Sequence, residues 1–211
     1  MLKKITLLIL LCVLTTTICF LFAGNPLLDT LYFSGENIRR GYFWTPITSL
    51  FIHADLMHLI GNMVFLYIFG GALEKEVGSA KTMLAFFLGG ALSFILSLYF
   101  YGYDVKMVGA SAAIFTLASI VMLIKPLKFS WIFLMPLGLV AILYFIYNLL
   151  AVYYLTSNVG IGYWGHIMGF LIGLPFGISW SRGKWKINLL ITAALLMLYL
   201  FAASIIAGAL F

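Results

Sequence analysis

Apolar residues run along this chain in long blocks without Asp, Glu, Lys or Arg, and the charges gather in the segments between these blocks. A helix needs about 20 consecutive apolar residues to span the hydrocarbon core of a bilayer. The blocks are 18 residues or longer, close to this length or above it, so the pattern predicts a protein that crosses a membrane several times. The uncharged blocks are residues 5–23, 56–73, 82–103, 107–124, 129–181 and 187–211.

The block 129–181 is long enough for two spans, so a break must lie inside it. The polar, glycine-bearing segment 156–162 is the expected break. The predicted fold class is all-α, a polytopic membrane helix bundle in a single domain (1–211), with one long connection at 24–55 on the outer side. The seven expected helices lie at about 4–24, 56–74, 82–103, 110–125, 131–156, 163–181 and 187–211.

The placement of the basic residues tests this arrangement independently. With a cytoplasmic N-terminus and alternating helices, nine of the 12 basic residues fall on the cytoplasmic side and three outside. The positive-inside rule predicts such an asymmetry, so we expect the N-terminus in the cytoplasm and the C-terminus outside. The cytoplasmic residues are Lys3, Lys4, Lys75, Lys81, Lys125, Lys128, Arg182, Lys184 and Lys186, and the outer ones are Arg39, Arg40 and Lys106.

The composition, 64% hydrophobic and 9% charged, excludes an ordinary soluble domain. The net charge of +6 follows from the topology and requires no nucleic-acid partner. The first helix is expected to be retained, because its apolar core of about 20 residues exceeds the roughly 7–15 of a cleaved signal peptide. Cys12 and Cys19 lie seven residues apart on this helix, too far for a disulfide between them, and form no metal site.

The outer connection 24–55 differs from an ordinary soluble loop. Its apolar and aromatic residues alternate with Glu36, Arg39 and Arg40, a pattern typical of a segment that lies in the membrane interface. Backbone at that depth must be helical or buried against protein, so we expect a structured, partly embedded loop. The apolar residues are Phe33, Ile38, Tyr42, Phe43, Trp44, Phe51 and Ile52.

Polar groups inside the membrane are few and are candidates for function. His58 and Asn62 lie four residues apart on one expected helix and so share a face. Ser111 begins another helix and His166 lies near the outer end of a third. Alternating topology places all four residues at the same outer depth, where they have the parts of a serine hydrolase.

A serine becomes an effective nucleophile beside a base, and the imidazole of His166 is able to take and return a proton near neutral pH. The N–H groups at the start of the helix that follows Gly109 are free to stabilise an oxyanion, and His58 and Asn62 offer further donors. No acidic residue is placed near His166, so the sequence predicts a Ser–His dyad without a third member.

Glycines recur every four residues on the expected helix 163–181 and predict a face that another backbone approaches closely. His166 lies beside the first of them, and Gly169 follows on its own face. Each polar residue also has a structural alternative: Ser111 as a helix cap, His166 as a tie between helices, and His58 with Asn62 as a hydrogen-bonded knot. The glycines are Gly165, Gly169, Gly173 and Gly177.

Four motifs resemble those of the rhomboid family of intramembrane serine proteases, a likeness that extends from the Trp44 region to Ser181. They are HADLMHLIGN at 53–62, GGALEKEVG at 70–78, GASA at 109–112 and HIMGFLIG at 166–173. The resemblance implies a six-helix core, to which this chain adds a C-terminal seventh transmembrane helix.

The resemblance also implies roles for individual residues. Ser111 is the nucleophile and His166 the general base and acid, while Phe115 packs on the catalytic imidazole. His58, Asn62 and the backbone N–H groups of Ala110 and Ser111 form the oxyanion hole. Glu74 matches a structural carboxylate and has no catalytic role.

Two positions depart from the family pattern. Ala112 stands where the family usually has glycine, and its methyl group is expected to narrow the space beside the nucleophile. Thr45 stands where the first loop usually has arginine after Trp44, so another residue, Arg39 or Arg40, is expected to anchor that loop.

By family analogy the substrate is a transmembrane protein that unwinds near the outer leaflet and enters past the fifth helix, beneath a cap at 156–163. We therefore expect an endopeptidase of a prokaryotic cell membrane that needs no metal or cofactor. Two other classes stay open: a catalytically silent relative that binds transmembrane helices, and a transporter or haem carrier that uses His58 and His166. No inverted repeat or metal-ligand spacing supports the last of these.

Overall fold

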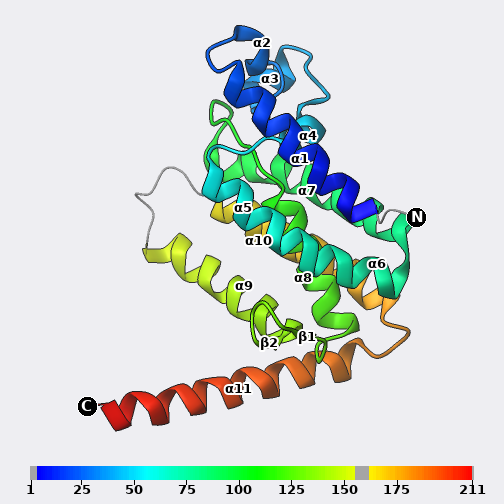
Figure 1. The fold of residues 1–211 in the computed structure, drawn as a ribbon, viewed down its shortest axis with the longest axis vertical. Helices are drawn as coiled ribbons and strands as arrows, with labels where there is room; N and C mark the ends of the chain where they lie inside the picture. Colours follow the sequence, from blue (N-terminus) through cyan, green and yellow to red (C-terminus); the bar gives the residue numbers. More distant parts are fainter. Residues whose placement is uncertain (1–3, 155–161, 211) are drawn as a thin grey trace.

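The computed structural model describes residues 4–154 and 162–210 as an all-α bundle with one small β-hairpin, whose two strands have two residues each (Figure 1). This confirms the predicted fold class. The elements are α1 (Lys4–Leu21), α2 (Pro26–Asp29), α3 (Gly35–Arg39), α4 (Thr45–Thr48), η1 (Ser49–Phe51), α5 (Leu56–Phe65), η2 (Leu66–Gly70), α6 (Gly71–Val77), α7 (Ser79–Tyr101), α8 (Ser111–Ile124), β1 (Phe129–Ser130), β2 (Met135–Pro136), α9 (Leu137–Tyr154), α10 (Tyr163–Trp180) and α11 (Trp185–Leu210).

Among the described residues, five helical segments are long and apolar enough to cross a bilayer: α1, the continuous α5–η2–α6, α7, α9 and α11. The apolar helix α8 is shorter, at 14 residues, and α10 has 18. The protein is therefore an integral membrane protein. Together these segments correspond to the predicted six-helix core and C-terminal seventh helix.

The boundaries differ from the expected ones where local structure intervenes. The first helix ends at Leu21, and the second continues through the π-helical segment η2 to Val77. The fifth begins at Leu137 instead of about residue 131, because the antiparallel pairs Phe129–Pro136 and Ser130–Met135 fold the preceding residues into a hairpin. The expected break at 156–162 and the cap at 156–163 fall almost wholly on residues outside those described.

Helix α8 forms the centre of the bundle, and every residue from 112 to 123 is buried. Helices α7, α9 and α10 pack around it. A helix that is apolar on all sides must be enclosed by other helices or by lipid. Ser111 is the first residue of this helix, so its hydroxyl lies at the end of an element that is buried along nearly its whole length.

The glycines of α10 allow that helix to approach α8 closely. A Cβ at Gly169 would clash with the carbonyl of Ala112, and one at Gly173 with the carbonyl of Thr116. The hydroxyl of Thr116 also donates to the Gly169 carbonyl at 2.9 Å. Gly165 differs, since a Cβ there would meet only ordinary contacts. The close-packing face predicted from the sequence therefore consists mainly of its later glycines.

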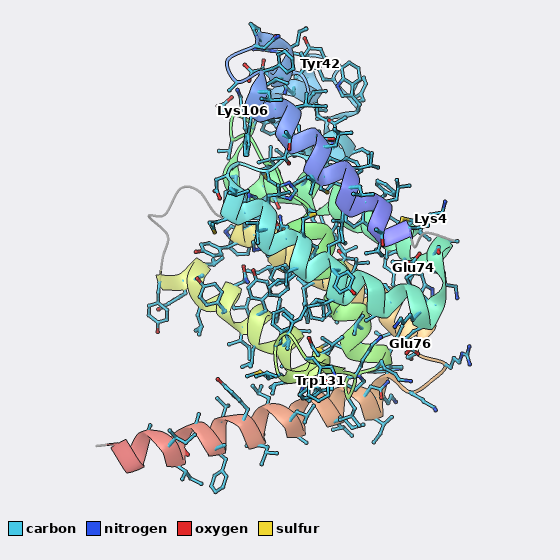
Figure 2. The ribbon with its side chains drawn as sticks, in the orientation of Figure 1. Lys4, Tyr42, Glu74, Glu76, Lys106 and Trp131 are labelled. Atoms are coloured by element: carbon cyan, nitrogen blue, oxygen red, sulfur yellow. The ribbon has the colours of Figure 1, made fainter. Side chains whose placement is uncertain are left out.

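The charged side chains gather at the two ends of the bundle (Figure 2). At one end Glu74 accepts from the backbone N–H of Lys4 at 2.9 Å, and Lys125 lies 3.6 Å from Glu76. At the other end Lys106 pairs with Asp29 at 2.7 Å. These ends match the two groups of basic residues distinguished in the sequence.

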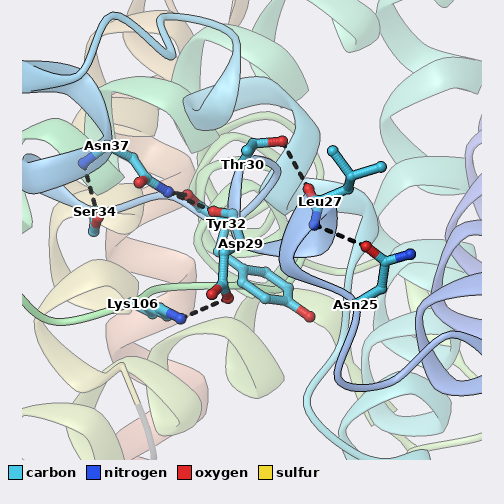
Figure 3. Close-up of polar contacts among 8 residues, drawn as sticks. All are labelled: Asn25, Leu27, Asp29, Thr30, Tyr32, Ser34, Asn37 and Lys106. Atoms are coloured by element: carbon cyan, nitrogen blue, oxygen red, sulfur yellow. Dashed lines mark hydrogen bonds and ion pairs between the residues drawn. The ribbon is translucent and has the colours of Figure 1, made fainter.

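The connection 24–55 is held by its own hydrogen bonds (Figure 3). The Asn37 amide donates to the carbonyls of Asp29 and Tyr32, both at 2.7 Å. The Trp44 indole donates to the Thr30 carbonyl at 2.8 Å. Thr45 is buried, and its hydroxyl donates to the Tyr42 carbonyl in the same turn at 2.9 Å.

The two arginines considered as anchors of this connection differ in their contacts. Arg39 lies 4.2 Å over the ring of Tyr103 and so links the connection to the segment after α7. Among the residues that the structure describes, the Arg40 side chain pairs with Glu36 at the start of the preceding helix α3. Arg39 is thus the arginine whose described contact joins this region to the rest of the bundle.

Helix α11 diverges from the other helices towards the C-terminus (Figure 1). Near its start Asn188 donates to the carbonyls of Leu123 and Ile124 at 2.7 and 3.1 Å, which fixes it to the end of α8. Beyond this attachment most of its large apolar side chains are exposed, as expected for a helix surrounded by lipid.

Candidate active site

The hydroxyl of Ser111 lies 2.8 Å from Nε2 of His166. Ser111 starts α8 and His166 lies in the first turn of α10, so the close glycine contact between these helices brings the two residues together. His166 is only 8% exposed. The arrangement places a hydroxyl and a possible proton acceptor within hydrogen-bonding distance in a nearly enclosed site.

The imidazole of His166 is held by aromatic packing. The ring of Phe115 stacks on it with a centroid distance of 4.7 Å and an interplanar angle of 7°. Tyr144 of α9 in turn stacks on Phe115 at 4.7 Å, and the ring of Tyr163 approaches His166 edge-on. The orientation of the imidazole is therefore set by groups from three helices.

The second ring nitrogen of His166 also has a partner, which sequence reasoning missed. Nδ1 lies 2.7 Å from Oδ1 of Asn148, a residue of α9 that is 1% exposed. Asn148 is a single amide in an otherwise apolar helix apart from its aromatic hydroxyls. A single amide in an apolar membrane helix was the feature of the sequence that indicated a polar contact, but the sequence alone does not say which neighbour the amide faces.

His58 and Asn62 lie beside Gly109, two residues before Ser111. A Cβ at Gly109 would lie 2.7 Å from Nε2 of His58 and 3.4 Å from Nδ2 of Asn62. Gly109 also has a φ of +110°, which favours glycine, so this position excludes a side chain for two reasons. Within the described residues, Nδ2 of Asn62 is buried and has no hydrogen-bond partner.

The Ala110 N–H faces Nε2 of His53 at 3.5 Å, a long hydrogen bond. His53 is 1% exposed, and its Nδ1 lies 3.1 Å from the hydroxyl of Thr16, which donates to the Phe51 carbonyl. Burial, with a smaller effect from His58, lowers the pKa of His53 to about 3. A neutral His53 therefore links α1 to the backbone that precedes Ser111.

An open apolar pocket of about 320 Å³ lies beside the site, between the second and fifth membrane segments. Its wall includes Tyr144, whose ring reaches His166 through Phe115. Along this path the rings of Tyr144 and Phe115 separate the pocket from the imidazole. Its lining residues are Phe65 of α5, Phe133 and Met135 of the hairpin region, and Val140, Leu143, Tyr144 and Tyr147 of α9.

This fold and site define a polytopic membrane protein with a partly buried serine–histidine pair. The family model of the rhomboid domain matches residues 40–183, which include every residue of that site. The chain belongs to the rhomboid family.

Three curated proteins illustrate the relationship. Rhomboid-like protease 3 of Toxoplasma gondii is 27% identical over 66% of this chain and 52% of its own length. Rhomboid protease GluP of Bacillus subtilis is 30% identical over 83% of this chain and 36% of its own length. Rhomboid protease GlpG of Salmonella newport is 28% identical over 39% of this chain and 30% of its own length.

In each case the match covers about half or less of the relative. All three relatives are named as rhomboid proteases or rhomboid-like proteases.

Proposed function

We propose that this protein is an intramembrane serine endopeptidase in which Ser111 is the nucleophile and His166 the general base and acid. The observation that carries the proposal is the 2.8 Å contact between the Ser111 hydroxyl and Nε2 of His166. A serine that donates to an imidazole is activated for attack on a carbonyl carbon.

In the proposed reaction, the Ser111 oxygen attacks the scissile carbonyl while its proton passes to Nε2 of His166. The imidazolium then gives this proton to the leaving amine, and the C–N bond breaks to leave an acyl-enzyme. Water, deprotonated by the same imidazole, hydrolyses the ester and restores the serine.

The developing oxyanion is stabilised by side-chain and backbone N–H donors close to Ser111. Nδ2 of Asn62 is the strongest candidate, because it is buried without a protein partner among the described residues. His58 and the N–H of Ser111 complete the set, and the Ala110 N–H joins it by exchanging its long contact with His53. Phe115, Gly109 and Gly169 act by supporting this geometry.

The substrate is a transmembrane protein cleaved near the outer leaflet. In this proposal the N-terminus is cytoplasmic and the C-terminus outside, in a prokaryotic cell membrane, with Ser111 at the outer end of α8. The apolar pocket between α5 and α9 offers a place for an apolar segment of the substrate to approach from the lipid.

The test is labelling of the purified protein in detergent with a fluorescent serine-directed fluorophosphonate. The wild type should be labelled, while Ser111→Ala and His166→Ala should not, with all three proteins unfolding at similar temperatures. A folded wild type that stays unlabelled, or a Ser111→Ala variant that is still labelled, would refute the proposed nucleophile. Cleavage of a reconstituted transmembrane substrate, also lost in Ser111→Ala, extends the result to peptide bonds.

The competing function is a silent relative that binds transmembrane helices. It predicts that substrate helices are retained by the protein without cleavage and without labelling. Ala112, where the family usually has glycine, is the one residue that favours this alternative.

A further inference from the structure

The Ser–His pair has a third polar neighbour that comes from a different helix. Asn148 of α9 is 1% exposed, and its Oδ1 lies 2.7 Å from Nδ1 of His166. A buried amide that contacts the second ring nitrogen of a proposed base is able to set the tautomer and orientation of that imidazole.

The orientation of this amide follows from its second contact. Nδ2 of Asn148 donates to the carbonyl of Tyr144 at 2.7 Å, and a carbonyl oxygen only accepts. The amide oxygen must therefore be the atom that faces His166. Since an amide oxygen cannot donate, Nδ1 of His166 carries the proton.

A proton on Nδ1 leaves the neutral imidazole with a free lone pair on Nε2. This lone pair points to the Ser111 hydroxyl at 2.8 Å and is the acceptor that a general base needs. The other tautomer would place a lone pair of Nδ1 against the amide oxygen, which is repulsive, and would leave Nε2 protonated and unable to accept the serine proton.

We propose that Asn148 is a positioning residue that fixes the tautomer and ring orientation of His166. The hydrogen-bonded series Ser111–His166–Asn148 is called the relay here, although the amide itself passes no proton. This inference rests on the proposed protease function. The three residues come from α8, α10 and α9. The tautomer and ring orientation of His166 are therefore fixed only while α9 packs against α10. Tyr144, whose carbonyl orients the amide, also lines the apolar pocket, so the same turn of α9 contacts both pocket and relay.

The test measures the rate of fluorophosphonate labelling against pH in detergent for four proteins. Asn148→Leu keeps the side-chain size but removes the acceptor, and we expect its labelling to slow by about 10²-fold, on the scale of general-base catalysis. The matched control is Thr116→Val, which also removes a buried hydrogen bond between helices, Thr116 to Gly169, without a contact to His166. It should lose thermal stability but label at a rate close to that of the wild type.

Asn148→Asp keeps an oxygen at the acceptor position and adds a charge that stabilises the imidazolium. We expect it to label much faster than Asn148→Leu and to have the midpoint of its pH profile at higher pH than the wild type. The inference is overturned if folded Asn148→Leu labels at the wild-type rate. Should Asn148→Leu not fold, an unshifted profile in Asn148→Asp overturns it instead.

These outcomes separate the two proposals. If the wild type is not labelled at Ser111, the protease function fails and the relay with it. If the wild type is labelled and Asn148→Leu equals it, only the relay fails.

Discussion

Ala112 and Gly165 face each other across the contact between α8 and α10. A Cβ placed on Gly165 would lie 4.0 Å from the methyl carbon of Ala112, and Ala112 is 2% exposed. The methyl group that distinguishes this chain from the usual family pattern therefore lies in the space left by a glycine on α10.

Ala112→Gly should consequently have little effect on the chemistry. We expect the fluorophosphonate labelling rate to remain near that of the wild type, with a loss of about 1 kcal/mol in stability from the flexibility of glycine in a helix. Labelling kinetics and thermal unfolding in the same detergent provide the two measurements. A large increase in rate would mean that the methyl restricts access to the serine after all.

Gly169 should tolerate a methyl group far less well than Gly165. A Cβ at Gly169 would clash with the backbone of Ala112, which cannot move without displacing Ser111. We expect Gly169→Ala to lose about 1–3 kcal/mol, the usual cost of overpacking, together with most of the labelling activity. Gly165→Ala is the matched control on the same helix and should remain active and stable. Equal behaviour of the two variants would contradict the close approach of the helices.

Asn62→Ala distinguishes an oxyanion donor from a structural knot. Since Nδ2 of Asn62 has no protein partner among the described residues, its removal should cost little stability but lower kcat by about 10²–10³-fold. The control is Asn188→Ala, which removes two hydrogen bonds to the end of α8 far from Ser111. That variant should unfold at lower temperature with kcat unchanged. The reverse pattern would identify Asn62 as the structural residue.

His53 should make the fold sensitive to acid. Its pKa is about 3 in the folded protein, against 6.5 for an ordinary histidine, so below pH 6.5 the unfolded chain binds a proton that the folded one does not. The contribution of neutral His53 to the free energy of unfolding is therefore fully present above pH 6.5. It decreases as the pH falls towards 3, by up to about 1.4 kcal/mol per pH unit.

His53→Gln cannot take up this proton and should show a shallower loss of thermal stability between pH 7 and pH 4 than the wild type. The two proteins are compared at equal ionic strength, with pH 7 as the reference where both side chains are neutral. Parallel curves for wild type and variant would show that His53 is not responsible.

Much of this fold follows from the sequence because the bilayer restricts the solutions. Uncharged blocks of the right length must be helices, and the separation of basic residues matches the two charged ends of the bundle. The pairing of Ser111 with His166 was inferable as well, because alternating topology placed both at one depth and the α10 glycines predicted a close contact. The observed 2.8 Å distance adds the geometry.

The sequence could not identify the contacts that depend on rotation of a helix about its axis. Asn148 lies in a helix that is apolar on every side, so periodicity does not show which face meets α10. The link from His53 to Ala110 joins residues 57 positions apart, and each of the two lies in an irregular segment just before a helix. The hairpin before α9 was hidden because β1 and β2 have only two residues each.

The orientation in the membrane is tested most directly at the end of α11. The attachment of Asn188 to the carbonyls of Leu123 and Ile124 places the start of α11 beside Lys125, in the group of basic residues assigned to the cytoplasm. A single crossing from there puts the C-terminus outside. A C-terminal alkaline phosphatase fusion should therefore be active in a bacterial host and the matching green fluorescent protein fusion dark. Fusions after Lys125 should give the opposite pattern, and a fluorescent C-terminal fusion would exclude either the crossing by α11 or the orientation of the whole bundle.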